Sequence, residues 1–420
     1  MASRQSTQAE SDVLVAGGGP AGIAAAIAAA RAGAKTTLIE THGCLGGVWT
    51  AGQLAWVFEG ANSGIVSEIA NALSAMGARR QEPTTSAYSY DVEAMKVLCE
   101  RLCIEAGVRI RLQTRVVDAV VEDGRIRQAV TESKSGREHW PSKAFIDCSG
   151  DGDFGSFAGC SFDLGGPNGE IQPCTLMAII SVGDLKAIKE FVSFIDGNPW
   201  QRHEESIKAF LGEMDKLGIK LSYMRPTIFH LRDNLCALMA NHEYKVSAID
   251  ADSVTQATLR ARQELWQLVE GLRSLGGKWS GVAIASTAEQ IGIREARRLH
   301  GLYTVSDDDL RNGASFDDAV CRCSFGVDVH SCDPAKDKGL SNMGFRSKPY
   351  QIPYRSLVAK DVKGLLMAGR CISGGWLPHA SYRVTGTAAA LGEAAGKAAA
   401  FSARTGRLPH ELRWSEIAGV

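Results

Sequence analysis

The chain has 420 residues, enough for two domains or for one domain with a large insertion. Its 46 basic and 47 acidic residues nearly balance, so the charge favours neither a nucleic acid nor an anionic membrane as a partner. The first ten residues are polar, unlike a secretory signal, and Arg31 and Gly33 interrupt the longest alanine-rich run, which is too short to span a bilayer. The 11 cysteines have no spacing typical of zinc or iron–sulfur ligands. We therefore expect a soluble, cytoplasmic protein without a metal site.

Residues 12–40 have the pattern of a strand, a glycine turn, an alanine-rich helix and a second strand that ends in an acid. This order is typical of a dinucleotide site. Gly17 permits the tight turn, Gly19 lets the backbone approach a pyrophosphate, and Gly22 lets the helix pack closely on the strand. Glu40 is placed to accept hydrogen bonds from ribose hydroxyls. The residues expected around the phosphates are Gly17, Gly19, Pro20, Ala21 and Gly22.

The next elements alternate between helix and strand. Residues 91–106 have helical periodicity, with one apolar face made of Met95, Leu98, Cys99, Leu102 and Cys103. Residues 108–112 and 115–121 alternate as strands do, and a hairpin turn is expected at 122–125. Residues 145–150 are predicted to form another strand that ends in a glycine turn.

The middle of the chain has a different character. A strand is expected at 175–182 and a long amphipathic helix at 254–275. We predict the buried stripe of that helix to be Leu259, Leu265, Trp266, Leu268 and Leu272. In a further helix near 290–298, Arg294 and Arg298 would share one face at i and i+4.

The C-terminal part returns to the style of the N-terminal part, with a strand and turn at 363–370 and a small-residue helix at 386–401. The simplest architecture is an α/β fold in which a Rossmann-type FAD-binding domain carries an inserted α+β substrate domain. The FAD-binding domain would comprise residues 10–165 and 342–420, and the substrate domain residues 166–341.

Several sequence motifs decide between NAD and FAD as the dinucleotide. In chain order they are the opening fingerprint, residues 43–52 (GCLGGVWTAG), 147–153 (DCSGDGD), 172–177 (QPCTLM), 290–298 (QIGIREARR), 352–355 (IPYR), 366–373 (LMAGRCIS) and 383–393 (RVTGTAAALGE). With these motifs the chain resembles the FAD-dependent oxidoreductase family of the glutathione-reductase-type flavoprotein superfamily. The resemblance covers residues 12–400.

The resemblance implies bound FAD and a set of cofactor contacts. Residues 368–370 would pass near the ribityl chain and pyrophosphate, and the helix that starts at 385–387 would direct its N–H groups toward the flavin. Residue 116 or 117 would offer backbone contacts to the adenine. The further cofactor residues expected are Glu40, Gly46, Gly47, Val117, Gly369, Arg370, Gly386 and Thr387.

Candidates for the chemistry lie between the last cofactor strand and this helix. His379 is the first choice for a proton acceptor or donor because the ordinary pKa of histidine is near neutrality; the alternative is a loop-shaping hydrogen bond. Tyr382 is expected to hold a substrate oxygen. Arg383 is a candidate to pair with a carboxylate or with the reduced flavin, although a structural ion pair is an equal alternative. Of Arg294 and Arg298, one is expected to reach the site and the other to pair with Glu295 or an external acid, and Arg294 is the candidate for the site. His330, on an apparent strand, is a weaker candidate.

Two motifs receive a structural interpretation. Residues 150–155 also read GxGxxG, but the segment that follows is short and broken by glycines, so we favour packing against the FAD site over a separate NAD(P)H site. Cys44 and Cys371 fall in expected FAD loops, and buried thiols are favoured there over covalent attachment to the flavin.

The sequence thus predicts a FAD-dependent oxidoreductase, a dehydrogenase or oxidase, that moves a hydride between flavin N5 and a C–OH, C–N or C–C bond of a small organic substrate. A reductase or monooxygenase acting on a carboxylate-bearing or aromatic substrate is the alternative. Electron transfer to a protein partner and isomerisation with reduced flavin are rivals from other classes. The expected partner is a small-molecule substrate, with a homo-oligomer left open.

Overall fold

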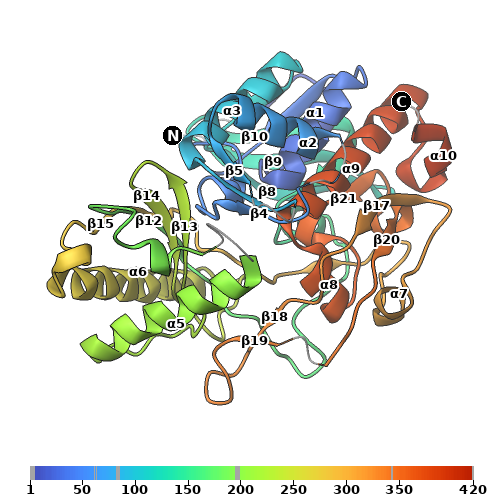
Figure 1. Ribbon diagram of the computed structural model, residues 1–420. Helices are drawn as coiled ribbons and strands as arrows, with labels where there is room; N and C mark the ends of the chain where they lie inside the picture. The colour runs from blue at the N-terminus through green and yellow to red at the C-terminus, as the bar shows by residue number, and fades with distance from the viewer. Residues whose placement is uncertain are drawn as a thin grey trace.

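The computed structural model describes residues 5–60, 62, 64–81, 86–193, 199–341 and 344–418. Elements from the two ends of the chain lie together, as the blue and red ribbons of Figure 1 show, whereas the green and yellow elements of the middle form a second body. This arrangement agrees with the α/β, Rossmann-type fold predicted from the sequence.

A parallel sheet forms the centre of the first body. Its strand order is β7-β3-β2-β10, and β21 pairs with the C-terminal half of β10, whose N-terminal half pairs with β1 and continues into the antiparallel hairpin β9-β8. The strands are β1 (Gln5–Thr7), β2 (Ser11–Ala16), β3 (Thr36–Ile39), β7 (Arg109–Arg111), β8 (Arg115–Glu122), β9 (Arg125–Ser133), β10 (Gly136–Asp147) and β21 (Leu365–Met367). Strands β2, β3 and β21 are buried almost throughout, as expected for parallel strands covered on both faces.

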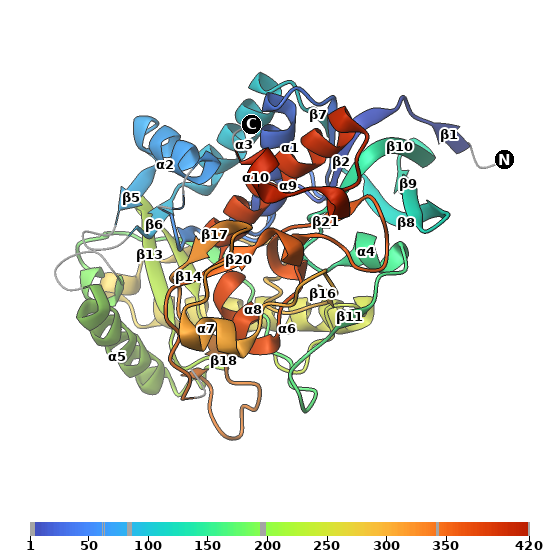
Figure 2. The same cartoon turned by 90° about the vertical axis from the view of Figure 1, so that its right-hand side faces the viewer.

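Two helices from opposite ends of the chain lie against each other on this sheet (Figure 2). They are α1 (Pro20–Arg31) and α9 (Thr385–Thr405). A Cβ atom on Gly392 would lie 2.0 Å from the carbonyl oxygen of Ala21, and one on Gly396 would lie 2.2 Å from that of Ala25. The small residues of α9 therefore set how closely its backbone approaches α1.

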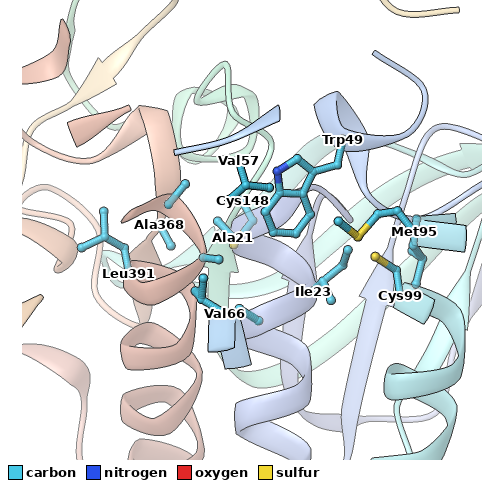
Figure 3. Close-up of a cluster of buried hydrophobic side chains, with 14 of the residues drawn as sticks. Ala21, Ile23, Trp49, Val57, Val66, Met95, Cys99, Cys148, Ala368 and Leu391 are labelled. Carbon is cyan, nitrogen blue, oxygen red and sulfur yellow. The ribbon is translucent and has the colours of Figure 1, made fainter. Parts of the chain in front are cut away.

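The core of this body joins both ends of the chain. Figure 3 shows Ala21 and Val66 in one buried cluster with Ala368 and Leu391. The predicted helix at 91–106 is observed as α3 (Val92–Glu105), and its five predicted apolar residues are all buried. The other elements around the sheet are β4 (Trp56–Val57), α2 (Ile65–Ala75), β5 (Arg79–Gln81), β6 (Tyr88–Tyr90), α4 (Asp153–Phe157) and α10 (Trp414–Ile417).

The second body is an antiparallel sheet with two long helices (Figure 1). The strand order is β13-β14-β12-β15. Its elements are β12 (Ala178–Ser181), α5 (Pro199–Leu217), β13 (Thr227–Arg232), β14 (Leu235–Met239), α6 (Ala251–Ser274) and β15 (Ala283–Thr287).

The predicted buried stripe of α6 is wrong in part. Leu259 and Trp266 are 54% and 60% exposed. The buried positions are Ala257, Ala261, Leu265, Leu268, Val269 and Leu272. Their spacing of three and four residues follows the 3.6-residue period, and the prediction missed the two alanines and Val269 because it favoured large side chains.

The remaining strands form short pairs outside the two main sheets. They are β11 (Phe162–Asp163) with β16 (Arg298–Leu299), β17 (Ala319–Cys323) with β20 (Tyr350–Pro353), and β18 (Val329–His330) with β19 (Leu340–Ser341), together with helices α7 (Asp307–Asn312) and α8 (Trp376–Tyr382). The pairing of β17 with β20 crosses the predicted domain boundary between 341 and 342, and residues 342 and 343 lie outside the described residues. The division at this boundary stays a prediction.

Candidate cofactor and active site

The three glycines of the first turn have different surroundings. Gly17 has a φ of +100°, and a Cβ atom there would lie 2.4 Å from the carbonyl oxygen of Cys148. A Cβ atom on Gly22 would lie 1.7 Å from the carbonyl oxygen of Gly17. A Cβ atom on Gly19 would have no heavy atom of the described residues within 4 Å, apart from its chain neighbours. Gly17 and Gly22 therefore serve turn and packing, whereas Gly19 borders open space at the N-terminus of α1, where Pro20 is the first residue.

Glu40, at the end of β3, is buried and fixed by two backbone amides. Its carboxylate accepts the N–H of Gly18 at 2.6 Å and that of His42 at 2.7 Å. The loop that follows packs directly on the glycine turn, because Gly46 donates its N–H to the carbonyl of Gly18 and a Cβ atom on Gly47 would lie 2.8 Å from the Gly19 Cα. The acid and both loops are thus held around one turn.

Val117 is an unpaired residue on β8. In the ladder with β9, Val116 faces Thr131 and Asp118 faces Val130, so Val117 forms a bulge between them. A bulged residue leaves its backbone groups outside the ladder. The backbone groups of Val117 are therefore available for the contact to an adenine ring that the resemblance implies.

The C-terminal cofactor residues reach the same turn. Gly369 has a φ of +88°, and a Cβ atom on it would lie 3.2 Å from the Cβ of Ala21. Arg370 forms an ion pair with Asp151 at 2.7 Å and donates to the carbonyl of Ile293. Arg370 therefore ties this turn to two other segments of the chain.

Helix α9 begins beside these residues without a side-chain cap at Val384. Gly386 donates its N–H to the carbonyl of Phe58 at 3.2 Å, so this amide is already engaged by the protein. The Thr385 hydroxyl is buried, and none of the described residues is its hydrogen-bond partner. Thr387, two residues farther along the helix, is fully buried.

These observations fit a bound FAD. Open space borders Gly19, the N-terminus of α1 has no side-chain cap, and the buried hydroxyl of Thr385 at the start of α9 has no hydrogen-bond partner in the described part of the chain. A helix N-terminus stabilises phosphate oxygens or a developing negative charge. The residues that would hold the cofactor are those around the turn, Glu40, the bulge at Val117, and the segments at 369–370 and 385–387.

The second GxGxxG is filled by the chain itself. Helix α4 is five residues long. The buried carboxylate of Asp147 accepts the Gly155 N–H at 2.7 Å, and a Cβ atom on Gly155 would lie 2.4 Å from Leu299. Asp153, in the first turn of α4, pairs with Arg297 at 2.8 Å. The motif serves packing between segments, as the sequence interpretation favours.

The two cysteines of the cofactor loops carry protonated thiols. Burial raises the pKa of Cys44 and raises that of Cys371 well above its usual range. A protonated thiol is a poor nucleophile. This favours buried thiols over covalent attachment to a flavin.

Helix α8 carries His379 and Tyr382 into the interior. His379 is fully buried, and neither ring nitrogen has a hydrogen-bond partner among the described residues. Burial, reinforced by nearby arginines, holds the pKa of His379 well below its ordinary value, so the ring is neutral. The Tyr382 hydroxyl donates to the carbonyl of Ile372 at 3.2 Å, and its ring packs 5.6 Å from that of His379. To hold a substrate oxygen, as predicted, the Tyr382 hydroxyl would have to give up its hydrogen bond to Ile372 and donate to the substrate instead.

The segment that carries Arg294 is not helical, which corrects the expected i, i+4 geometry. Gly292 pairs with Thr175 as an isolated bridge, and this backbone pairing replaces a helix. Arg294 donates through Nη1 to the Pro173 carbonyl at 2.6 Å and to the Thr175 hydroxyl at 2.9 Å. Arg298, in contrast, is buried and pairs with Glu295 at 2.9 Å.

A chain of polar side chains lies next to Arg383. Arg383 approaches Asp328 at 3.3 Å, and the other neighbour of this carboxylate is His330 Nε2 at 3.5 Å. His330 Nδ1 lies 3.1 Å from His242 Nε2, whose Nδ1 lies 3.4 Å from the hydroxyl of Tyr244.

Three of these residues were missed from the sequence. Asp328 directly precedes the strand of His330, but nothing in the spacing predicted that His242 and Tyr244, about 90 positions earlier, would meet them. His330, the weaker candidate from the sequence, lies between Asp328 and His242 in this row of polar side chains.

Burial and neighbouring charges set the pKa values of these polar side chains. Burial and the charge of Arg294 together lower the pKa of His330 to about 4, against the opposing effect of Asp328. Burial also lowers the pKa of His242. Despite burial, His330 and Arg383 hold the pKa of Asp328 well below its usual range. At neutral pH the pair is therefore two neutral imidazoles beside an ionised carboxylate.

No described helix is both long and apolar enough to cross a membrane. The part of the chain that the structure describes also has no group of three or more His, Cys, Asp or Glu side chains arranged to hold a metal ion.

Comparison with known proteins agrees with the geometry. Thiamine thiazole synthase of Methanothermobacter thermautotrophicus is 32% identical over 117 residues, which are 27% of this chain and 43% of that protein. The corresponding protein of Pyrococcus abyssi is 32% identical over 119 residues, 28% of this chain and 45% of that protein. The chain thus spans less than half of the length of these curated relatives.

The structure of the flavin-dependent brominase Bmp2 aligns with a TM-score of 0.50 and 13% identity, covering 97% of this chain and 81% of that chain, which shows a shared fold. A family model described as FAD dependent oxidoreductase matches residues 12–419. The chain therefore belongs to the FAD dependent oxidoreductase family and binds FAD.

Proposed function

We propose that this protein transfers a hydride between a C–OH, C–N or C–C bond of a small organic substrate and flavin N5. FAD supplies the hydride acceptor or donor when bound. Each such transfer needs a partner for the accompanying proton, and that partner must come from the protein or from water.

One observation carries the proposal. Arg383, two residues before the start of α9, contacts Asp328. From Asp328 a row of polar side chains continues through His330 and His242 to Tyr244. Tyr244 is half-buried, whereas the imidazoles are buried. A path of polar contacts of 3.1 to 3.5 Å therefore leads from the half-buried Tyr244 to the segment that precedes the helix expected to face the flavin.

The path has two complete hydrogen arrangements. In one, Tyr244 donates to His242 Nδ1, His242 Nε2 donates to His330, and His330 Nε2 donates to the Asp328 carboxylate. In the other, each hydrogen lies one place farther along: Asp328 is protonated, and Tyr244 donates to the carbonyl of Ser222, 3.0 Å away. Conversion of the first arrangement into the second delivers one proton to Asp328 and takes one from solvent at Tyr244. The reverse conversion removes a proton. The chain thus suits reaction in either direction.

This assignment gives the proton step to His330 in preference to His379. His330 has hydrogen-bonding neighbours on both ring nitrogens, whereas His379 has none among the described residues. His379, Tyr382 and Arg383 remain candidate contacts of substrate or flavin. We also infer that the family belongs among the glutathione-reductase-type flavoproteins, which the parallel strand order and the glycine turn support.

An anaerobic absorbance titration tests the proposal. The purified flavoprotein is mixed with a panel of small alcohols, amines, saturated acids and activated alkenes, in both the oxidised and the dithionite-reduced state. Bleaching by one compound, or reoxidation by one alkene, supports hydride transfer. Bleaching by NAD(P)H alone would support the alternative, a reductase or monooxygenase. A flavin that responds to no compound and to neither nicotinamide would contradict the proposal.

A further inference from the structure

Four arginines surround the candidate site, and their ion pairs differ. Three of them have a carboxylate partner: Arg298 with Glu295 at 2.9 Å, Arg370 with Asp151 at 2.7 Å, and Arg383 with Asp328 at 3.3 Å. Arg294 has no carboxylate within ion-pair distance among the described residues. It is therefore the arginine of this set whose charge the protein leaves without a direct partner.

The position of Arg294 makes that charge costly. The side chain is half-buried, and burial lowers its pKa, although Tyr223, Asp328, Cys174 and Tyr244 act in the opposite direction. Removal of a cation from water without a counterion is unfavourable. Asp328 does not offset it directly, because its carboxylate is shared between Arg383 and His330.

Arg294 is also held in a fixed orientation. Both of its hydrogen bonds to the protein use Nη1, one to the Pro173 carbonyl and one to the Thr175 hydroxyl. They leave the edge formed by Nε and Nη2 without a described partner. This edge of a guanidinium carries two parallel N–H groups, which match the two oxygens of a carboxylate.

The hydrogen bonds of Arg294 connect it to the proton path. The Thr175 hydroxyl that accepts from Arg294 donates in turn to the carbonyl of Asn241, the residue before His242, at 3.0 Å. The charge of Arg294 accordingly lowers the pKa values of both His242 and His330. The ring of Tyr223 lies 3.9 Å from that of His242 and 5.9 Å from that of His330. A group bound at Arg294 would therefore lie beside the residues that exchange the proton.

We propose that Arg294 is the binding site for a carboxylate of the substrate, and that the substrate class is a small carboxylic acid. This inference rests on the proposed function for the identity of the ligand as a substrate. The carboxylate supplies the missing counterion and directs the adjacent carbon toward the His330–Asp328 pair. Arg294 is then a specificity-determining residue.

The test uses the intact flavoprotein and matched pairs of neutral and anionic probes. Benzoate, acetate and succinate are compared with benzamide, acetamide and succinamide, and the perturbation of the flavin absorbance bands is titrated. We expect at least one carboxylate to perturb the flavin and its amide to bind at least tenfold more weakly. Equal responses to carboxylates and amides, or no response to any carboxylate, would overturn the proposal.

Variants then assign the effect to Arg294. Arg294→Met should weaken carboxylate binding by about 30-fold or more, and Arg294→Lys should weaken it less. Arg311→Met is the matched control, since Arg311 is exposed on α7 and pairs with Asp308. The affinity of this variant for the carboxylate probes should equal that of the wild type. Each variant must keep the wild-type ratio of FAD to protein. A loss of FAD in Arg294→Met, with unchanged carboxylate affinity in the remaining holoenzyme, would show that Arg294 serves the cofactor.

The outcomes separate this inference from the proposed function. Arg294-dependent binding of carboxylates without bleaching by any substrate would retain the anion site and contradict hydride transfer. Bleaching only by uncharged alcohols or amines, unaffected by Arg294→Met, would retain hydride transfer and overturn the carboxylate site.

Discussion

The imidazoles of His242 and His330 meet nitrogen to nitrogen at 3.1 Å, although one residue precedes β18 by almost 90 positions. A hydrogen bond between two ring nitrogens requires one to donate and the other to accept, so the two tautomers are coupled. The neighbour of His330 Nε2 is the Asp328 carboxylate, and the neighbour of His242 Nδ1 is the Tyr244 hydroxyl, which also lies 3.0 Å from the carbonyl of Ser222. This coupling is the basis of the first two predictions.

Substitution of His330 should uncouple the proton from the hydride. In His330→Gln the path from Tyr244 to Asp328 is broken, and we expect the rate of substrate-dependent flavin reduction to fall by about 10²- to 10⁴-fold with FAD content unchanged. Stopped-flow absorbance under anaerobic conditions measures this rate. His410→Gln, at an exposed histidine near the C-terminus, is the control. A large loss in His379→Gln together with a normal rate in His330→Gln would return the role to His379.

The pH dependence of stability should report the same histidine. Because the folded-state pKa of His330 is lowered to about 4, the unfolded chain binds a proton between about pH 6.5 and pH 4 that the folded chain does not bind. Its contribution is therefore present near neutral pH and is lost as the pH falls through this window. Relative to His330→Gln, the wild type should lose unfolding free energy between pH 7 and pH 5 in chemical denaturation. A difference that is constant with pH would mean that folding leaves the pKa of His330 unchanged, and a wild type that gains stability as the pH falls would mean that His330 is protonated in the folded protein.

The glycine turn could be predicted residue by residue because its function depends on local geometry. The strand, turn, helix and acid lie within 29 residues, and each glycine performs a job that sequence spacing reveals. The proton path could not be predicted in this way. Its members come from β18, from the residues after β14 and from the segment before α9, and only tertiary packing brings them together. Likewise, the segment of Arg294 is not helical and Gly292 in it pairs with Thr175, a contact that local periodicity does not encode.

Two alanine substitutions in the first turn should separate binding from folding. Gly19→Ala has room for its methyl group and a φ of −74° that alanine adopts readily, so the apoprotein should keep its Tm while the affinity for FAD falls tenfold or more. Gly22→Ala would place a methyl group 1.7 Å from the Gly17 carbonyl, so both Tm and FAD binding should fall. Flavin absorbance per protein and thermal unfolding of the apoproteins measure the two effects. Normal FAD binding by Gly19→Ala would show that the cofactor does not approach this backbone.

Glycine-to-alanine substitutions in two other helices should have opposite signs. In α9, Gly392→Ala forces a methyl group to within 2.0 Å of the Ala21 carbonyl, so α1 and α9 must separate, at a cost of about 1–3 kcal/mol or more. In α5, nothing lies within 4 Å of the corresponding position on Gly212, and alanine there should raise the unfolding free energy by about 0.5–1 kcal/mol through helix propensity. Urea denaturation of both variants compares them under one condition. Since the chemistry of the substitution is identical, a destabilised Gly392→Ala beside a stabilised Gly212→Ala would assign the cost to the contact between the two helices. Equal stabilisation of both would mean that α9 can withdraw from α1 without loss.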